Sequence, residues 1–194
     1  MTQPWTHTAG AVAYPRVDEW YVEPEWVSAR LFQEETFSGN IYDPCCGMGR
    51  IVVSALKSGY SAYGSDIVNR GWDAVPRDFL QQSAQHDNIV TNPPFDKIRA
   101  VTEHALRLAR RKVAVIMPTA RLNAARWLIG SNLETVWLLT PRPSMPPGHH
   151  IQAGGKVGGG KSDYCWLVFS KGYDDLPALC WLGRDDLKGT GETA

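Results

Sequence analysis

The first segment with residues suited to ligand chemistry runs from Asp43 to Arg50, with the sequence DPCCGMGR. Its acidic residue ends a short apolar run, and Gly47 and Gly49 allow the backbone to approach a nucleoside or amino-acid group closely before a helix begins. Asp66 ends the next apolar run, 23 residues after Asp43, where a carboxylate accepts hydrogen bonds from ribose hydroxyls. The two acids and the glycines together predict a site for an adenosine-type cofactor.

The second segment is Asn92-Pro93-Pro94-Phe95, which directly follows an apolar run. Two consecutive prolines remove two backbone donors and stiffen the chain, so that carbonyl oxygens face the cleft beside the Asn92 side-chain oxygen. Asn92 Oδ1 and the Pro93 carbonyl would accept the two N–H bonds of a planar amine, while Phe95 stacks on the attached ring. The segment therefore predicts an acceptor site for an aromatic amine.

The elements that must position these segments alternate along the chain. Apolar runs predict strands at 41–43, 61–67, 88–92, 112–118, 135–141 and 163–170, and helical spacing predicts helices at 25–35, 50–59, 97–111 and 120–131. A further segment at 78–80 is expected to return to the sheet and to offer Asp78 and Phe79 to an adenine ring. We therefore predict an α/β fold with a Rossmann-like, doubly wound, mostly parallel seven-stranded sheet whose last strand is antiparallel.

Taken together, these segments resemble the class I S-adenosylmethionine-dependent methyltransferases that methylate amines. The cofactor loop at 43–49 precedes the catalytic loop at 92–95, and YVEPEW at 21–26 is similar to the family segment that closes over the methionine end of the cofactor. This order is similar to that of the unpermuted adenine-N6 DNA methyltransferases. The resemblance implies catalytic roles for Asn92, Pro93, Pro94 and Phe95. It implies cofactor binding by Tyr21, Glu23, Pro24, Asp43, Pro44, Cys45, Gly47, Gly49, Asp66, Ile67, Asp78 and Phe79.

The resemblance implies methyl transfer from S-adenosylmethionine to the exocyclic N6 amine of adenine in nucleic acid, with DNA favoured. An aromatic amine is a poor nucleophile because its lone pair is delocalised, and two acceptors held by the prolines would stabilise positive charge as it develops on nitrogen. An adenine in a duplex would be flipped out and stacked on Phe95. RNA adenine and protein glutamine methyltransferases share this loop and stay open as alternatives, as does a catalytically silent partner subunit that binds the cofactor or nucleic acid.

The charge pattern bears on the nucleic-acid partner. The chain carries 20 basic and 20 acidic residues, and this zero net charge argues against nucleic-acid binding by bulk electrostatics alone. Residues 97–126 nevertheless hold eight Lys or Arg against one acid, a local charge of +7. Residues 141–161 contain no acid, and we expect them to form a flexible loop that binds substrate or closes as a lid. The basic residues assigned to substrate binding are Arg121, Arg142, Lys156 and Lys161.

The remaining features bound the class of protein. None of the four cysteines has zinc-ligand spacing, so we expect reduced thiols and no metal. No apolar run reaches the ~18 residues of a membrane span, and the N-terminus has no secretory pattern, which predicts a cytoplasmic protein. The length fits one methyltransferase domain at 20–185, with a loose arm at 1–19 and a polar tail at 186–194. Target specificity must then come from the 141–161 loop, the arm or a partner, including a second copy in a homodimer.

Overall fold

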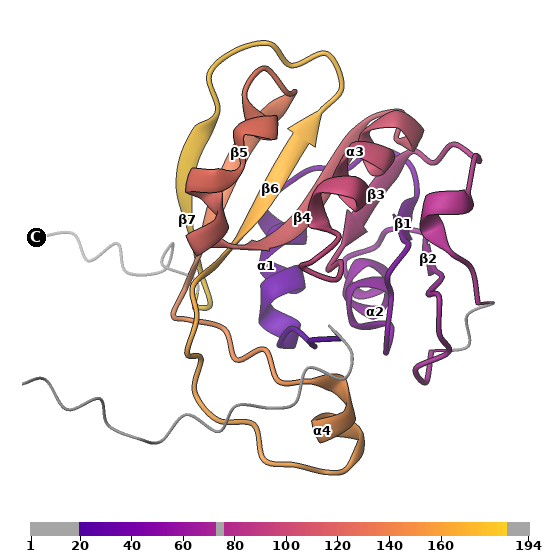
Figure 1. Cartoon of the computed structure of the whole chain (residues 1–194), viewed down its shortest axis with the longest axis vertical. Coiled ribbons are helices and arrows are strands. Elements are labelled where there is room, and N and C mark those ends of the chain that lie inside the picture. The colour runs from indigo at the N-terminus through magenta and orange to yellow at the C-terminus, as the bar shows by residue number, and fades with distance from the viewer. Residues whose placement is uncertain (1–19, 73–75, 186–194) are drawn as a thin grey trace, which may run out of the picture.

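The computed structural model describes residues 20–72 and 76–185, so the arm predicted at 1–19 and the tail predicted at 186–194 lie outside the described residues. Seven strands form one sheet in the order β2-β1-β3-β4-β6-β5-β7 (Figure 1). The strands are β1 (Ile41–Asp43), β2 (Ala62–Gly64), β3 (Asn88–Thr91), β4 (Lys112–Pro118), β5 (Leu133–Thr140), β6 (Tyr164–Ser170) and β7 (Ala178–Gly183). With its covering helices this is the Rossmann-like α/β fold that the sequence predicts.

Strand direction follows the prediction closely. β1 pairs in parallel with β2 and β3, and β3 pairs in parallel with β4. β6 is antiparallel to both of its neighbours, β4 and β5, and it is the strand predicted to be antiparallel at 163–170. The residues of β6 from Cys165 to Phe169 are at most 1% exposed, because the strand lies inside the sheet and is covered on both faces. Such burial explains the continuous apolar run that made the strand readable in the sequence.

The strand β7 follows β6 and was not predicted. It pairs in parallel with β5 and ends the sheet on that side. Leu182 is fully buried, whereas Leu179 and Trp181 are 58% and 66% exposed. An edge strand with one exposed face gives a weaker sequence signal than a strand buried on both faces.

Two other predictions about local structure were wrong. The segment predicted to return to the sheet at 78–80 forms a 3₁₀ turn, η1 (Phe79–Gln81), and not a strand. The helix predicted at 120–131 is replaced by two 3₁₀ segments, η2 (Thr119–Ala124) and η3 (Arg126–Leu128). Neither segment fully buries any of its own residues, and only Leu122, Trp127 and Leu128 pack partly against the core, which is little support for an amphipathic helix.

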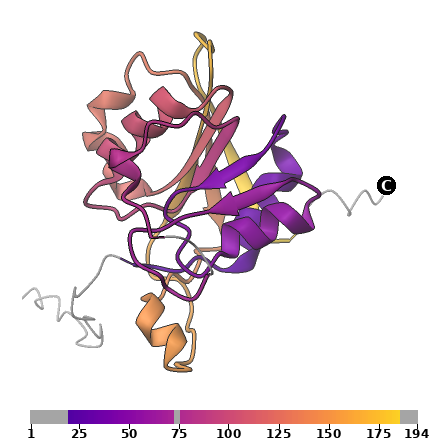
Figure 2. The same ribbon diagram turned by 90° about the vertical axis from the view of Figure 1, so that its right-hand side faces the viewer.

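The helices cover both faces of the sheet. α1 (Glu25–Glu34) packs against α2 (Arg50–Lys57) on one face, and α3 (Ile98–Leu108) lies on the other (Figure 2). The short helix α4 (Gly148–Gln152) lies beyond the carboxyl ends of the parallel strands (Figure 1). The indole Nε1 of Trp166 donates a hydrogen bond of 3.0 Å to the Val27 carbonyl, which fixes α1 to β6. Among the described residues, no helix has the length and apolar character needed to cross a membrane.

Candidate active site

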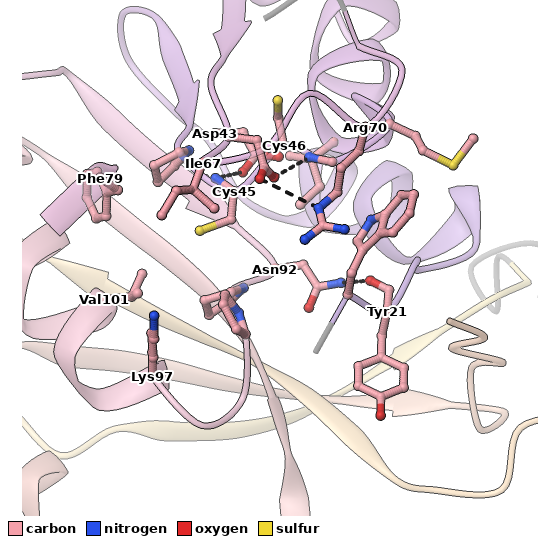
Figure 3. A pocket seen from close by; sticks show the side chains of 18 of the residues that line it. Tyr21, Asp43, Cys45, Cys46, Ile67, Arg70, Phe79, Asn92, Lys97 and Val101 are labelled. Carbon is pink, nitrogen blue, oxygen red and sulfur yellow. Dashed lines mark hydrogen bonds and ion pairs between the residues drawn. The ribbon is translucent and has the colours of Figure 1, made fainter. Parts of the chain in front are cut away.

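A pocket opens where the carboxyl ends of β1, β2 and β3 meet the segment that precedes α1 (Figure 3). The fold thus brings together most of the predicted cofactor and catalytic residues. Those that line the pocket are Tyr21, Glu23, Asp43, Pro44, Cys45, Gly47, Asp66, Ile67, Asp78, Phe79, Asn92, Pro93, Pro94 and Phe95. Pro24 and Gly49 are not among the lining residues. They lie one residue before α1 and α2, respectively, at the ends of the segments that do line it.

Asp43 lies at the end of β1, deep in the pocket wall. Its side chain is 1% exposed, and Oδ1 accepts hydrogen bonds from Thr91 Oγ1 at 2.7 Å and from the Cys45 backbone nitrogen at 3.1 Å. Burial raises the pKa of Asp43 well above its ordinary value, against the lowering effect of the Thr91 hydrogen bond, and the nearby carboxylate of Glu23 raises it further. A cationic ligand group beside Asp43 would therefore offset the free-energy cost of ionising this buried carboxyl group.

Asp66 is hydrogen-bonded to the predicted cofactor loop at 43–49. Its Oδ2 accepts a hydrogen bond of 2.9 Å from the Gly47 backbone nitrogen, and its Oδ1 accepts one of 3.1 Å from the Val68 nitrogen. Arg70 Nε lies 3.7 Å from Oδ1. The carboxylate thus connects the loop after β1 with the turn after β2, and it lines the pocket at the same time.

Two glycines of the loop adopt backbone conformations that other residues rarely take. Gly47 has φ of 49° and Gly49 has φ of 76°, both in the left-handed region. A Cβ on Gly49 would lie 2.1 Å from Cε3 of Trp72, and one on Gly47 would lie 2.8 Å from Nε1 of Trp20. The close approach of a ligand to these glycines stays a prediction, and what the structure shows is the close approach of two tryptophan rings.

The side chain of Asn92 is held on its nitrogen side. Nδ2 donates to the Tyr21 carbonyl at 2.9 Å and to Glu23 Oε2 at 2.8 Å. Both amide hydrogens are therefore used, and Figure 3 shows the bond to Tyr21 with the amide oxygen pointing away from it. Among the described residues, no group donates a hydrogen bond to Asn92 Oδ1. That oxygen is an available acceptor in the pocket.

The ring of Phe95 is enclosed by two tyrosines. It is 7% exposed, it is stacked on Tyr21, and it lies at a tilt of 37° to Tyr164 with the centroids 5.7 Å apart. Arg121 Nη1 donates a hydrogen bond to the Phe95 carbonyl oxygen. Arg121, whose predicted role in substrate binding stays a prediction, is thus bonded to the predicted catalytic loop from the segment after β4.

The predicted adenine residues make contacts of different kinds. Asp78 is exposed, and its Oδ1 accepts a hydrogen bond of 3.0 Å from the Leu80 nitrogen, which caps η1. Phe79 is 4% exposed and lies edge-on to the rings of His104 and Tyr42. Both residues line the pocket, with Phe79 supported from behind by a packed aromatic cluster.

The 141–161 segment folds back onto the residues that precede α1. The Val22 nitrogen donates to the Pro146 carbonyl at 3.0 Å, and the Gly148 nitrogen donates to the Trp20 carbonyl at 2.8 Å. A Cβ on Gly148 would lie 2.2 Å from the Trp20 ring, so the two segments are in close contact. Tyr21, which accepts a hydrogen bond from Asn92, also forms a β-bridge with Pro147 of this segment.

The four predicted substrate-binding residues, Arg121, Arg142, Lys156 and Lys161, are all exposed, and none of them lines the pocket. Arg142 pairs with Asp163 through contacts of 2.7 and 3.2 Å. The positive segment at 97–126 is also partly neutralised, since Lys112 Nζ lies 2.7 Å from Glu35 and 3.2 Å from Glu134 in a mostly buried cluster.

Several pocket residues were not identified from the sequence. Trp20, Arg70, Arg77 and Lys97 all line the pocket. The guanidinium of Arg70 lies 4.5 Å from the centroid of the Trp20 ring, in a cation–π arrangement. The high tryptophan content suggested that some rings line a cleft, but no sequence pattern indicated which ones. Within residues 20–72 and 76–185, no three His, Cys, Asp or Glu residues form a group able to hold a metal ion.

Comparisons with known proteins agree on the fold. No family model matches the sequence, and no curated protein matches it.

Solved structures do match: the Pyrococcus horikoshii protein PH1948, provisionally described as an RNA methyltransferase, has a TM-score of 0.57 at 14% identity, covering 75% of this chain and 82% of that one. The M protein of the type I restriction enzyme EcoKI has a TM-score of 0.57 at 13% identity, and the alignment covers 87% of this chain and 49% of that one. The Agrobacterium tumefaciens protein Atu636, described as a predicted O-methyltransferase, has a TM-score of 0.55 at 12% identity, covering 82% of this chain and 85% of that one. The chain thus has the fold of class I methyltransferases, whose acceptors differ.

Proposed function

We propose that residues 20–185 form one methyltransferase domain that transfers a methyl group from S-adenosylmethionine to the N6 amine of adenine in nucleic acid, with DNA favoured. The observation that carries the proposal is the hydrogen bonding of Asn92. Because both Nδ2 hydrogens are bound by Tyr21 and Glu23, the acceptor oxygen Oδ1 is left to a substrate amine in the same pocket as Asp43 and Asp66.

The residues present fit this cofactor. S-adenosylmethionine carries a sulfonium and an ammonium group, and the pocket contains two buried acids, Asp43 and Glu23, whose pKa values are raised by burial. A ligand cation would stabilise their ionised forms. Asp66 and Ile67 follow β2, where the ribose and adenine of such a cofactor would lie, and Phe79 supplies an apolar ring beside them. When bound, the cofactor supplies an electrophilic methyl group.

The chain's own residues would orient the acceptor. Asn92 Oδ1 and the Pro93 carbonyl would each accept an N–H bond from the exocyclic amine, which favours a pyramidal nitrogen and stabilises its developing positive charge. A strong general base is not required, because the methylated ammonium is acidic and loses its extra proton to water. Productive geometry requires the amine nitrogen about 3–3.5 Å from the methyl carbon. The rigid proline pair and the Arg121 hydrogen bond to Phe95 favour such precise placement.

The same loop fits the amine of an RNA adenine and the amide of a protein glutamine, so these acceptors are alternatives within the same chemistry. A silent partner subunit is the alternative of another class. The engagement of Asn92 by two acceptors disfavours it, because a silent copy has no need to orient this amide. Arg142, Lys156 and Lys161, on the 141–161 segment, are proposed to contact the phosphate backbone.

One experiment tests the proposal. The protein is incubated with methyl-labelled S-adenosylmethionine and, separately, with single-stranded DNA, duplex DNA, RNA and protein, and the labelled atom is identified. We expect label on adenine N6 in DNA, and we expect Asn92→Ala to lower kcat at least about 100-fold while calorimetry shows unchanged cofactor binding. Cofactor binding with no labelled acceptor would support the silent subunit, and full activity of Asn92→Ala would refute the mechanism.

A further inference from the structure

We propose that Glu23 is a positioning residue that orients the Asn92 amide so that Oδ1 faces the acceptor amine. This inference rests on the function proposed above and concerns the same site. The resemblance places Glu23 among cofactor-binding residues, whereas its contacts in the structure point toward the catalytic loop. The argument depends on the hydrogen bonds of Asn92 and on the surroundings of the Glu23 carboxylate.

An amide side chain can rotate by about 180° and exchange its oxygen with its nitrogen at little steric cost. Only hydrogen bonds distinguish the two orientations. At Asn92, both neighbours on the Nδ2 side are acceptors, the Tyr21 carbonyl at 2.9 Å and Glu23 Oε2 at 2.8 Å. The flipped amide would place Oδ1 against these two oxygens and would lose both bonds, so the pair of acceptors selects one orientation.

Glu23 is the more effective of the two acceptors when it is ionised. A hydrogen bond to a charged acceptor is about twice as strong as one between neutral groups, and it polarises the amide toward a more negative Oδ1. Burial restricts the side chain, since the residue is only 5% exposed, and Arg50 Nη1 fixes the backbone at this position by donating a bond of 3.2 Å to the Glu23 carbonyl. Of the described Lys and Arg side chains, none forms an ion pair with the carboxylate, so its charge acts on Asn92 directly.

The protonation state of Glu23 should therefore control the orientation of the amide. A protonated carboxyl keeps an acceptor oxygen but loses its charge, so its hydrogen bond to Asn92 Nδ2 weakens and the orientation that presents Oδ1 to the acceptor amine is less strongly favoured. Burial raises the pKa of Glu23, with the Asn92 bond and the charge of Arg50 opposing this shift, and the adjacent Asp43 is a second buried acid. Activity should accordingly rise with pH as Glu23 ionises, at a higher pH than for an exposed glutamate.

The test compares Glu23→Ala, Glu23→Gln and a matched control, Glu25→Gln. Glu25 is an exposed acid two residues away that pairs with Lys57, outside the pocket. We expect Glu23→Ala to lower kcat about 10- to 100-fold, with the acceptor KM and the cofactor dissociation constant changed less than about two-fold. Glu23→Gln keeps an acceptor oxygen and should recover part of kcat, and its pH profile should lack the acidic limb of the wild type. Glu25→Gln should match the wild type throughout.

The outcomes separate this inference from the proposed function. If the wild type labels no adenine, the proposed function fails. If the wild type is active but Glu23→Ala keeps full kcat, or loses activity only through weaker cofactor binding, then Glu23 does not position Asn92. Should Glu23→Ala fail to fold, the pH profile of Glu23→Gln decides, and a retained acidic limb overturns the inference.

Discussion

The ring of Tyr21 lies nearly parallel to the ring of Phe95, at an interplanar angle of 9° with the centroids 5.7 Å apart. A purine stacked between two rings needs contacts of about 3.5 Å on each side, hence a ring separation of about 7 Å. The present spacing is too short for an inserted base, so an acceptor that stacked between the two rings would require Tyr21 to shift. Because Tyr21 forms a β-bridge with Pro147, that shift would also displace the 141–161 segment.

This relationship predicts different effects for two substitutions at Tyr21. Tyr21→Phe preserves the ring and should behave as the wild type. Tyr21→Ala removes one of two stacking surfaces and should raise the acceptor KM about 10- to 100-fold, since stacking on an aromatic side chain contributes about 1–3 kcal/mol per base. Steady-state kinetics with a short adenine-containing oligonucleotide measures the effect. A lower KM in Tyr21→Ala would instead identify the ring as an obstacle that acceptors must displace.

The conformation of Gly49 predicts a selective defect in the cofactor loop. Gly49→Ala forces a Cβ into the left-handed region, at a cost of roughly 1–2 kcal/mol, and into contact with Trp72. We expect lower stability in urea and weaker cofactor binding by calorimetry. Gly59→Ala is the matched control, because Gly59 has φ of 87° and no atom within 4 Å of an added Cβ. It should show only the backbone cost and normal binding. Equal binding by the two variants would contradict the role of Gly49.

The burial of the Asp43 carboxylate predicts opposite effects of Asp43→Asn on the stability of the ligand-free protein and on cofactor binding. Its pKa is raised in the folded state by burial, so the folded protein retains a proton that the unfolded chain loses. Stability of the ligand-free protein therefore falls as pH rises from the unfolded pKa through the folded pKa, and the penalty remains above that range. Asp43→Asn should melt at a higher temperature than the wild type at neutral pH, with the difference vanishing in acid.

The same variant should bind S-adenosylmethionine about 10- to 100-fold more weakly, because a hydrogen bond to a charged group contributes about 1.5–3 kcal/mol. Differential scanning fluorimetry across pH and calorimetry measure the two effects. Asp163→Asn is the control, since Asp163 is exposed and does not line the pocket. A melting temperature of Asp43→Asn below that of the wild type at neutral pH would show that the ionised carboxylate stabilises the fold.

How much the sequence predicted depended on burial. Strands β4 and β6 are covered on both faces and were found as apolar runs, whereas β7 was missed because Leu179 and Trp181 face outward. The helix predicted at 120–131 had helical periodicity, but its apolar residues Leu122, Trp127 and Leu128 are only partly buried, and propensity alone does not stabilise a short helix. The hydrophobic pattern of the sequence thus identified those elements whose apolar residues are buried in the folded protein.

Within the candidate site, the sequence predicted residues that belong to contiguous motifs. Asp43 and Asn92 were found because each follows an apolar run, and both line the pocket. Trp20 and Arg70 could not be found in this way, since their roles depend on contacts with distant residues, such as Trp20 against Gly148. The link between Glu23 and Asn92 is of the same kind, because 69 residues separate them in the chain.

The basic residues that we predict to bind substrate should have two different roles, one for Arg121 and one for the 141–161 segment. If Arg142, Lys156 and Lys161 contact phosphates, replacing each with Ala should reduce the slope of log Kd against log salt by about 0.9 for duplex DNA. Arg121→Ala should leave that slope unchanged and lower kcat, because its guanidinium is bonded to the Phe95 carbonyl. Fluorescence anisotropy over a salt series and single-turnover kinetics measure the two quantities. If the variant with Arg142, Lys156 and Lys161 all replaced by Ala shows an unchanged slope, this segment does not contact phosphates. If Arg121→Ala reduces the slope, Arg121 itself contacts the nucleic acid.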